Sequence, residues 1–334
     1  MIKKLALSAI IFASSLIAAE QVNVYSSRHY DTDKQLFKAF EKNTGIKVKV
    51  IQAKDDALIK RLQTEGKNSP ADVFITVDAA RIQRATEKKL FQPIKSEVLE
   101  KKVPATLRDK DNQWFAITKR ARIIAVRKGS GFENKEYTYE ELADPKYKGQ
   151  IMVRSSSNVY NQSLMAAMIA HHGVEYATKW AKGIVTNMAR DPKGSDRDQA
   201  RGVAAGLGSI AIMNTYYLGK LAVGSASDKD TVSKLKVIFP KFKNGATHVN
   251  VSAAGVAKYA KNKENAIKFI EFLTSKEAQE IFAKGNYEYP VVEGSEISEL
   301  VNSWGTIEDD NLTINDLGEN NANAVKALDI AGWK

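Results

Sequence analysis

Alternating apolar runs and amphipathic runs succeed one another in the first third of the chain. Residues 21–27 (QVNVYSS) alternate apolar and polar positions and then become polar, which predicts a strand that ends in a loop. Residues 31–45 (DTDKQLFKAFEKNTG) place apolar side chains on one helical face and end at a glycine. They therefore predict a helix, with Asp31 or Thr32 as its N-cap.

Two more strands complete a first β-α-β-α-β series. They are IKVKVI (46–51) and ADVFIT (71–76), and a second helical run lies between them. Such a series predicts a mostly parallel sheet with helices on both faces. The same alternation returns later in the chain, in strand and helix patterns over residues 149–173, 208–221, 249–260 and 263–285.

The last of these runs has the pattern of a broken helix. Its second half begins with Thr274 and Glu277 at capping-box spacing. No Pro- or Gly-rich linker separates the two α/β series. We therefore expect two lobes joined by continuous strands, with a ligand cleft between them.

The N-terminal residues have the pattern of a secretory signal peptide. Residues 1–19 contain two early lysines, then an uncharged run over 5–19, and end in Ala-Ala. That run is shorter than the roughly 20 apolar residues that a membrane span needs. With no cysteine in the chain, a disulfide framework, a thiolate metal site and a lipid-modified N-terminal cysteine are excluded. We expect an exported, soluble and unanchored protein of the periplasm.

The net charge is +11, or +9 without Lys3 and Lys4 of the signal peptide. The lysines are scattered along amphipathic runs, and no nucleic-acid motif accompanies them. We interpret them as solvated helix faces and expect no nucleic-acid partner. An anionic docking partner is the alternative.

Three polar segments follow expected strands, and each contains tyrosine. They are SSRHY (26–30), RSSSNVY (154–160) and NTYY (214–217). Ligands of open α/β sheets bind outside the carboxyl ends of the strands, so these loops can face one crevice. Tyr216 and Tyr217 lie where a strand turns into a helix, where neighbouring side chains are only about 100° apart and can converge.

Several phenols at one point suit a hard trivalent cation. A phenol has a pKa of about 10, so it becomes an anionic ligand only when a strong Lewis acid ionises it. Ferric iron is the natural candidate. His29 adds an imidazole to the four phenols of Tyr30, Tyr160, Tyr216 and Tyr217. Such a shell leaves one net negative charge around Fe(III), which a nearby cation would balance; Arg120 and Arg122 are the candidates.

Other interpretations compete with a metal site. Each tyrosine alone can be a packed residue with a hydrogen-bonded hydroxyl. Ser155–Ser157 and Arg154 could hold phosphate or sulfate at a helix N-terminus. A metal-dependent hydrolase finds no support, because the sequence has no H-E-x-x-H and no convincing Ser/His/Asp set. His171, His172 and His248 are interpreted as structural.

With these segments, the chain resembles the periplasmic ferric ion-binding proteins, the iron receptors of bacterial ABC importers. The paired tyrosines and SSRHY are similar to the branch that holds iron through one histidine and four tyrosines. The likeness covers essentially the whole mature chain. It is carried by VYSSRHYDTD (24–33), PADVFITVDAARI (70–82), YKGQIMVRSSSNVYNQSLM (147–165), GSIAIMNTYYLGK (208–220) and YEYPVV (287–292).

The resemblance implies a type II periplasmic binding fold, with two α/β lobes joined by two crossover strands and a ligand cleft between them. It implies a monomeric binding protein that carries Fe(III) to an ABC permease of the inner membrane. Such a protein is not an enzyme. The implied N-terminal lobe comprises 20–121 plus 248–290, and the C-terminal lobe 122–247 plus 291–334.

The implied ligands are His29 and Tyr30 from the N-terminal lobe and three tyrosines from the C-terminal lobe. Another branch of the family uses a glutamate and a borrowed phosphate or carbonate. Asp55 and Asp56 lie near that region here, and Tyr30 can make the borrowed anion unnecessary. The candidate site therefore comprises the metal ligands His29, Tyr30, Tyr160, Tyr216 and Tyr217, and we expect Arg120, Arg122 and Ser155 around them.

Overall fold

The N-terminal lobe is built on parallel strands, as the alternating apolar pattern predicted. The computed structural model describes residues 20–28 and 30–334, so the expected signal peptide (1–19) and His29 lie outside the described residues. Strand β1 pairs in parallel with β2 on one side and β3 on the other. The elements of this part are β1 (Gln21–Ser26), α1 (Asp31–Thr44), β2 (Lys47–Gln52), α2 (Asp55–Glu65), β3 (Val73–Val77), α3 (Ala79–Glu87) and α4 (Glu97–Lys102).

Helix α1 begins one residue earlier than the sequence indicated. Its N-cap is Tyr30, neither Asp31 nor Thr32, and the side chain of Asp33 accepts from the backbone N–H of Tyr30. Gly45 ends the helix with φ 76, a left-handed conformation that glycine adopts without steric cost. The start of α1 thus fixes the backbone of a candidate ligand.

The C-terminal lobe repeats the strand-then-helix plan, with β5 and β6 parallel. Helix α5 was expected to end at Gly173; that residue breaks the helical geometry with φ 81 and ψ 164, but helical structure continues to Asn187. The elements of the C-terminal lobe are β5 (Ile151–Met152), α5 (Val159–Asn187), α6 (Asp196–Ala204), β6 (Ile210–Asn214), α7 (Thr215–Ala222), α8 (Ala226–Ser233), β7 (Leu235–Ile238), α11 (Glu299–Asn302), α12 (Ile314–Glu319) and α13 (Asn321–Ile330).

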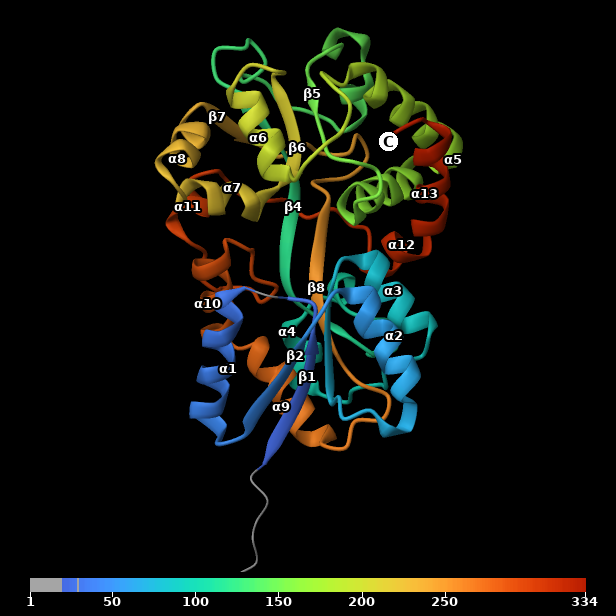
Figure 1. Ribbon diagram of the computed structural model, residues 1–334, viewed down its shortest axis with the longest axis vertical. Coiled ribbons are helices and arrows are strands. Elements are labelled where there is room, and N and C mark those ends of the chain that lie inside the picture. Colours follow the sequence, from blue (N-terminus) through green and yellow to red (C-terminus); the bar gives the residue numbers. More distant parts are fainter. Residues whose placement is uncertain (1–19, 29) are drawn as a thin grey trace, which may run out of the picture.

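Two long strands, β4 (Phe115–Arg127) and β8 (Val249–Val256), run side by side from one lobe to the other (Figure 1). They pair antiparallel with each other, and β4 then pairs antiparallel with β6 and β7. The strand order is β2-β1-β3-β8-β4-β6-β5. The expected parallel pairing is confirmed for β1, β2 and β3, but it does not extend to the whole sheet, because the crossover strands β4 and β8 pair antiparallel with their neighbours.

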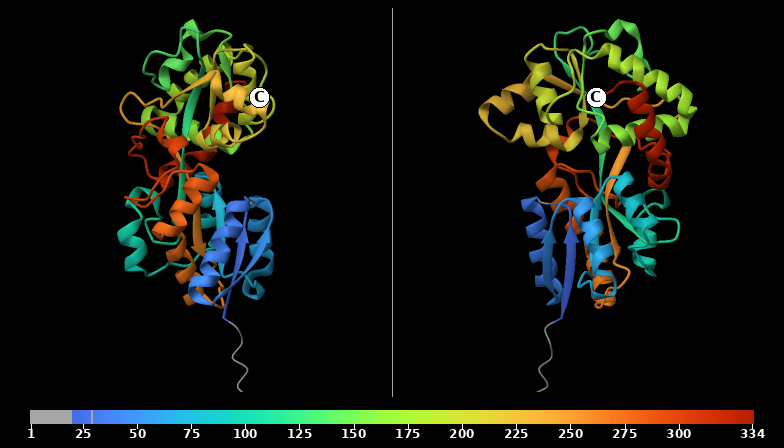
Figure 2. Two further views of the ribbon diagram at one scale, coloured as in Figure 1. Left: turned by 90° about the vertical axis from the view of Figure 1, so that its left-hand side faces the viewer. Right: turned by 45° about the vertical axis from the view of Figure 1, so that its right-hand side comes forward.

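The chain returns to the N-terminal lobe through β8 and forms α9 (Lys263–Leu273) and α10 (Lys276–Asn286). The break between the two helices was predicted, but the cap is Ser275, whose hydroxyl accepts from Ala278 N, and not Thr274. The views from other sides show the same two lobes with a waist between them (Figure 2). Two α/β lobes joined by crossover strands confirm the predicted fold class.

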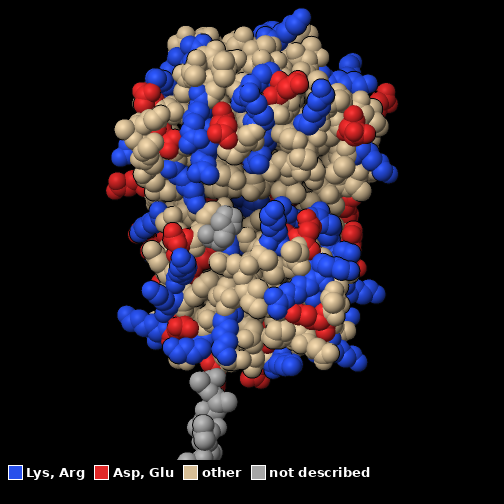
Figure 3. Space-filling model, in the orientation of Figure 1, with Lys and Arg blue, Asp and Glu red and all other residues tan. Residues whose placement is uncertain are grey.

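Lys and Arg side chains are spread over both lobes on the face drawn in Figure 3, interspersed with Asp and Glu. Some basic side chains also lie in the hollow at the waist. No helix among residues 20–28 and 30–334 combines the length and the apolar character that crossing a membrane requires.

Candidate metal centre

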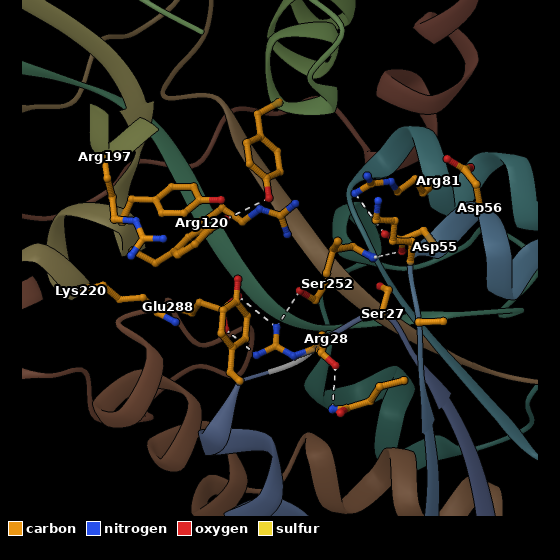
Figure 4. Close-up of a pocket in the computed structure, with 18 residues that line it drawn as sticks. Ser27, Arg28, Asp55, Asp56, Arg81, Arg120, Arg197, Lys220, Ser252 and Glu288 are labelled. Carbon is orange, nitrogen blue, oxygen red and sulfur yellow. Dashed lines mark hydrogen bonds and ion pairs between the residues drawn. The ribbon is translucent and has the colours of Figure 1, made fainter. Parts of the chain in front are cut away.

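A cleft of about 860 Å³ lies between the lobes, and tyrosines from three distant segments line it. Figure 4 shows its basic and acidic side chains converging from both lobes. The crossover strands contribute Arg120 from β4 and Ser252 from β8. The titratable lining residues are Tyr30, Tyr160, Tyr216 and Tyr217, the cations Arg28, Lys54, Arg81, Arg120, Arg197 and Lys220, and the carboxylates Asp55, Asp56 and Glu288.

Tyr216 and Tyr217 occupy the second and third positions of α7, directly after strand β6. Their ring centroids are 4.3 Å apart with an interplanar angle of 34°. The strand-to-helix turn thus brings adjacent side chains together, as the sequence predicted. The guanidinium of Arg197 lies 5.9 Å from the ring centroid of Tyr217.

Tyr160, the second residue of α5, lies beside the Tyr216–Tyr217 pair. The N-cap of that helix is Asn158, whose side chain accepts from Tyr160 N at 3.0 Å. The hydroxyl of Tyr216 donates to the hydroxyl of Tyr160 at 3.0 Å. Two phenol oxygens from helices 56 positions apart in sequence are therefore in direct contact.

Tyr30 faces this group from the N-terminal lobe. Its ring meets the ring of Tyr216 edge-on, with centroids 6.4 Å apart. The ammonium of Lys220 lies 3.7 Å from the Tyr30 ring centroid and the guanidinium of Arg28 lies 5.2 Å from it. Both cations are close enough for cation–π attraction. His29, the predicted imidazole ligand, is outside the described residues.

The cleft favours the protonated form of three of its phenols, those of Tyr30, Tyr160 and Tyr216. Burial and, after it, the carboxylate of Glu288 raise the pKa of Tyr30 to about 12, although the charge of Arg28 lowers it. Burial likewise raises the pKa of Tyr160 and Tyr216 well above the usual value, and each is raised further by the neighbouring phenols. Ionising these groups at neutral pH therefore requires a strong Lewis acid.

An ion pair between Arg28 and Glu288 anchors the loop that carries Tyr30. The sequence did not suggest this pair. The Arg28 guanidinium is 2% exposed and makes two bonds to the Glu288 carboxylate, at 3.1 and 2.8 Å. It also contacts Asp33 at 3.1 Å and the Ser252 hydroxyl at 2.8 Å. Burial alone would raise the pKa of Glu288, but the charge and hydrogen bonds of Arg28 lower it overall.

Sequence reasoning could have pointed to this pair only weakly. Arg28 lies within the SSRHY segment and Glu288 within YEYPVV, both of which carry the family resemblance. Their pairing joins positions 260 apart, and no local pattern indicates it. A buried arginine bonded on several sides needs a compensating carboxylate, which is what the fold supplies here.

The two predicted arginines occupy different places. Arg120 is buried, lines the cleft, and lies 5.7 Å from the ring centroid of Tyr160. Arg122 instead points into the C-terminal lobe, where it contacts Asp196 at 2.7 Å and Asn161 at 2.6 Å. Among the described residues that line the cleft, Arg120 is thus the predicted cation that the fold places beside the phenols, and Arg122 is not.

Ser155 does not reach the cleft either. Its hydroxyl bonds to that of Ser157 at 2.8 Å, in the loop before α5. The guanidinium of Arg154, the basic group of the alternative phosphate or sulfate site, lies 3.6 Å from the carboxylate of Asp196. A negative charge of the protein therefore already faces this arginine. By contrast, Asp55 and Asp56 do line the cleft, where Asp55 contacts Arg81 at 3.2 Å.

None of the three histidines interpreted as structural lines the cleft, although His248 lies next to the cleft residues Arg120 and Tyr160. His171 and His172 contact Asp310 at 2.8 Å and Glu140 at 2.6 Å. His248 is buried directly before β8. Over residues 20–28 and 30–334, no cluster of three or more His, Cys, Asp or Glu side chains is placed to hold a metal ion. Within the described part of the chain, the tyrosines are therefore the metal-binding candidates.

Known proteins share this fold over nearly the whole chain. A family described as bacterial extracellular solute-binding proteins matches residues 68–304. Iron uptake protein A1 of Synechocystis sp. is 48% identical over 94% of this chain and 88% of that protein. The solved structure of Trichodesmium IdiA (FutA) in complex with iron and citrate has 49% identity and a TM-score of 0.91, covering 94% of this chain and all of that one. The ferric binding protein from Campylobacter jejuni has 45% identity and a TM-score of 0.87, with 94% and 100% covered.

Proposed function

This chain belongs to the family of bacterial extracellular solute-binding proteins, and we propose that its solute is ferric iron, bound in the cleft between the two lobes. The names of its relatives refer to iron uptake and ferric binding. The observation that carries the proposal is the convergence of four tyrosine side chains from three distant segments on one cleft. Clustered phenols are of little use to a neutral organic solute, but they are strong ligands for a hard trivalent cation.

The proposed ligands are His29 and Tyr30 from the N-terminal lobe and Tyr160, Tyr216 and Tyr217 from the C-terminal lobe. Iron would first meet the C-terminal tyrosines and then draw the other lobe onto itself, since only a closed cleft offers it ligands from both lobes. Arg120, Arg197 and Lys220, which line the cleft, would balance the excess negative charge of the ligand shell.

The wider role follows from the family. We propose that the protein works in the periplasm, after removal of residues 1–19, and delivers iron to an ABC-type permease of the inner membrane. This is a binding role and not catalysis, as in its relatives. The lobe boundaries at 121/122, 247/248 and 290/291 stay predictions. The iron-related relatives do not support the alternative of a phosphate or sulfate receptor.

Adding Fe(III) as a weak chelate to the purified mature protein tests the proposal. Phenolate-bound iron should colour the protein through ligand-to-metal charge transfer. The double variant Tyr216→Phe, Tyr217→Phe should show a clearly weaker charge-transfer band and bind iron at least about 100-fold more weakly, since it loses two of the four anionic ligands.

The matched control is Tyr176→Phe, Tyr259→Phe, which removes two tyrosines that are 40% and 38% exposed. It should colour as the wild type does. A colourless wild type, or equal colour in both double variants, would contradict the proposal.

A further inference from the structure

Asp78 has a backbone conformation that its local role does not require. It lies between β3 and α3, is fully buried, and has φ 81 and ψ 138. Residues other than glycine rarely adopt a positive φ, and such conformations persist only where the surroundings enforce them. Asp78 caps α3 by accepting from Ala80 N at 3.2 Å. Capping needs no positive φ, because Asn158 caps α5 with φ −82.

The surroundings that hold Asp78 come from both lobes and from both crossover strands. Its Oδ1 accepts from the hydroxyl of Ser163 on α5 at 2.7 Å. Its Oδ2 accepts from Asn250 Nδ2 on β8 at 2.9 Å and lies 3.6 Å from the guanidinium of Arg120 on β4. Asn250 closes the cluster, because it also donates to Ser163 Oγ at 2.7 Å and accepts from Ala79 N at 3.0 Å.

Two of these partners, Ser163 and Arg120, lie close to Tyr160 of the candidate metal centre. Ser163 follows Tyr160 by three positions on α5, so the two side chains lie on the same face of the first turns of that helix. Arg120 lies 5.7 Å from the Tyr160 ring centroid. Its Nε and Nη2 have no hydrogen-bond partner among the described residues. The ion pair with Asp78, at 3.6 Å from Nη2, therefore helps to hold this guanidinium beside Tyr160.

We propose that Asp78 is a positioning residue for the metal centre: it fixes Tyr160, through Ser163, and Arg120 relative to the N-terminal lobe. The inference rests on the proposed function, because it assigns Asp78 a role in holding iron. A cap of α3 alone would need neither the bond to α5 nor the contact with Arg120. The geometry joins the lobes at the base of the cleft, where a small displacement moves Tyr160 relative to Tyr30.

Two variants test this role by different routes. Asp78→Asn keeps the size of the side chain and its tolerance of positive φ, but it replaces a carboxylate oxygen with an N–H donor facing the donors Ser163 and Asn250. Ser163→Ala removes only the hydroxyl that reaches across from α5. The measurement is the rate of iron dissociation into excess chelator, together with the wavelength of the charge-transfer band.

We expect Ser163→Ala to release iron about 10-fold faster, and Asp78→Asn about 10- to 100-fold faster, as for the loss of hydrogen bonds to a buried charged group. The charge-transfer band should shift in both variants, because Tyr160 is displaced. A matched control is Asp144→Asn. Asp144 is the N-cap of the short 3-10 helix Pro145–Tyr147; its side chain accepts from Lys146 N at 2.9 Å and is 47% exposed. It should leave both the rate and the band unchanged.

The outcomes separate this inference from the proposed function. Wild-type protein that binds no iron would overturn both. Wild type that binds iron, with an unchanged dissociation rate and band in the variants, would overturn the positioning role alone, whatever their melting temperatures. If Asp78→Asn fails to fold, Ser163→Ala decides the question by itself, because a buried Ser-to-Ala change removes one oxygen and adds no bulk.

Discussion

Three tyrosines of the cleft, Tyr30, Tyr160 and Tyr216, hold their protons more tightly than a free phenol does. Burial and the carboxylate of Glu288 raise the pKa of Tyr30 to about 12, and burial also raises the pKa of Tyr160 and Tyr216. At neutral pH these groups are phenols, so each one that becomes an iron ligand must release a proton. Iron and protons therefore compete for the same oxygens.

Iron affinity should accordingly rise with pH. At neutral pH each tyrosine that becomes a phenolate ligand displaces one proton, so four such ligands predict a slope of up to about four in log affinity per pH unit. Competition against a chelator with known pH dependence, between pH 6 and 8, measures this slope. Tyr216→Phe should lower it by about one unit. A slope that is the same in both proteins would contradict ligation by Tyr216.

At the scale of elements, two helix N-termini present the C-terminal tyrosines. Tyr160 is the second residue of α5, and Tyr216 and Tyr217 are the second and third of α7. Free backbone N–H groups and the helix dipole favour negative charge at these positions. The helix starts thus place the phenols and also stabilise the phenolates that iron creates.

The position of α7 depends on a close approach to the end of α10. A Cβ atom added at Gly219 would lie 2.5 Å from both Cβ and Cγ of Tyr287, which ends α10 in the left-handed conformation with φ 58. Neither atom is at the flexible end of its side chain, so the helices would have to separate. Gly219 therefore allows the contact that brings the paired tyrosines toward the N-terminal lobe.

Gly219→Ala should weaken iron binding by about 10-fold or more and lower the free energy of unfolding by about 1–3 kcal/mol through overpacking. Iron titration and urea unfolding measure the two effects. Gly183→Ala is the matched control, because its Cβ would meet the Cβ of Ala143 at 2.6 Å, within the C-terminal lobe. It should lower stability in the same way and leave iron affinity unchanged. Equal loss of affinity in both variants would show that α7 has no special role.

For the whole molecule, stability in acid depends on a histidine at the junction of the lobes. His248 directly precedes β8, and its carbonyl accepts from Arg122 N at 3.0 Å. Burial and, after it, the charges of Arg122, Arg120 and His171 together lower the pKa of His248 to about 3. The folded protein therefore keeps His248 neutral at a pH where the unfolded chain protonates it.

The free energy of unfolding should fall as the pH falls, because the unfolded chain protonates His248 before the folded protein does. Above pH 6.5, the ordinary pKa of histidine, both states carry neutral His248 and its full contribution to stability is present. Between pH 6.5 and about 3 the unfolded chain binds one more proton, so the free energy of unfolding falls by about 1.4 kcal/mol per pH unit. Below the folded pKa the loss levels off.

Urea unfolding of the metal-free protein at several pH values measures this contribution. His248→Asn should reduce the slope between pH 6 and 4 by about 1.4 kcal/mol per unit, whatever its effect at neutral pH. His172→Asn, which removes a histidine bonded to Glu140, should keep the His248 part of the slope. Parallel pH profiles for wild type and His248→Asn would contradict this account.

Features that depend on neighbouring residues could be predicted from the amino-acid sequence. Apolar periodicity predicted β1, α1, β6 and α7, and a glycine marked the end of α1, because strand alternation, helix faces and caps depend on residues a few positions apart. The same local reasoning indicated that Tyr216 and Tyr217 could converge at a strand-to-helix turn. Tyr30 and Tyr160 were likewise candidates because they follow expected strands, and the fold brings them to the same cleft.

Only the tertiary structure decided how distant segments meet. The antiparallel crossing of β4 and β8, the choice of Arg120 over Arg122 as the cation beside Tyr160, and the bond from Ser163 to Asp78 depend on chain topology. So does the pairing of Arg28 with Glu288, which lie 260 positions apart. Buried charges are stable only beside partners that the fold supplies, and no local pattern encodes which partner that is.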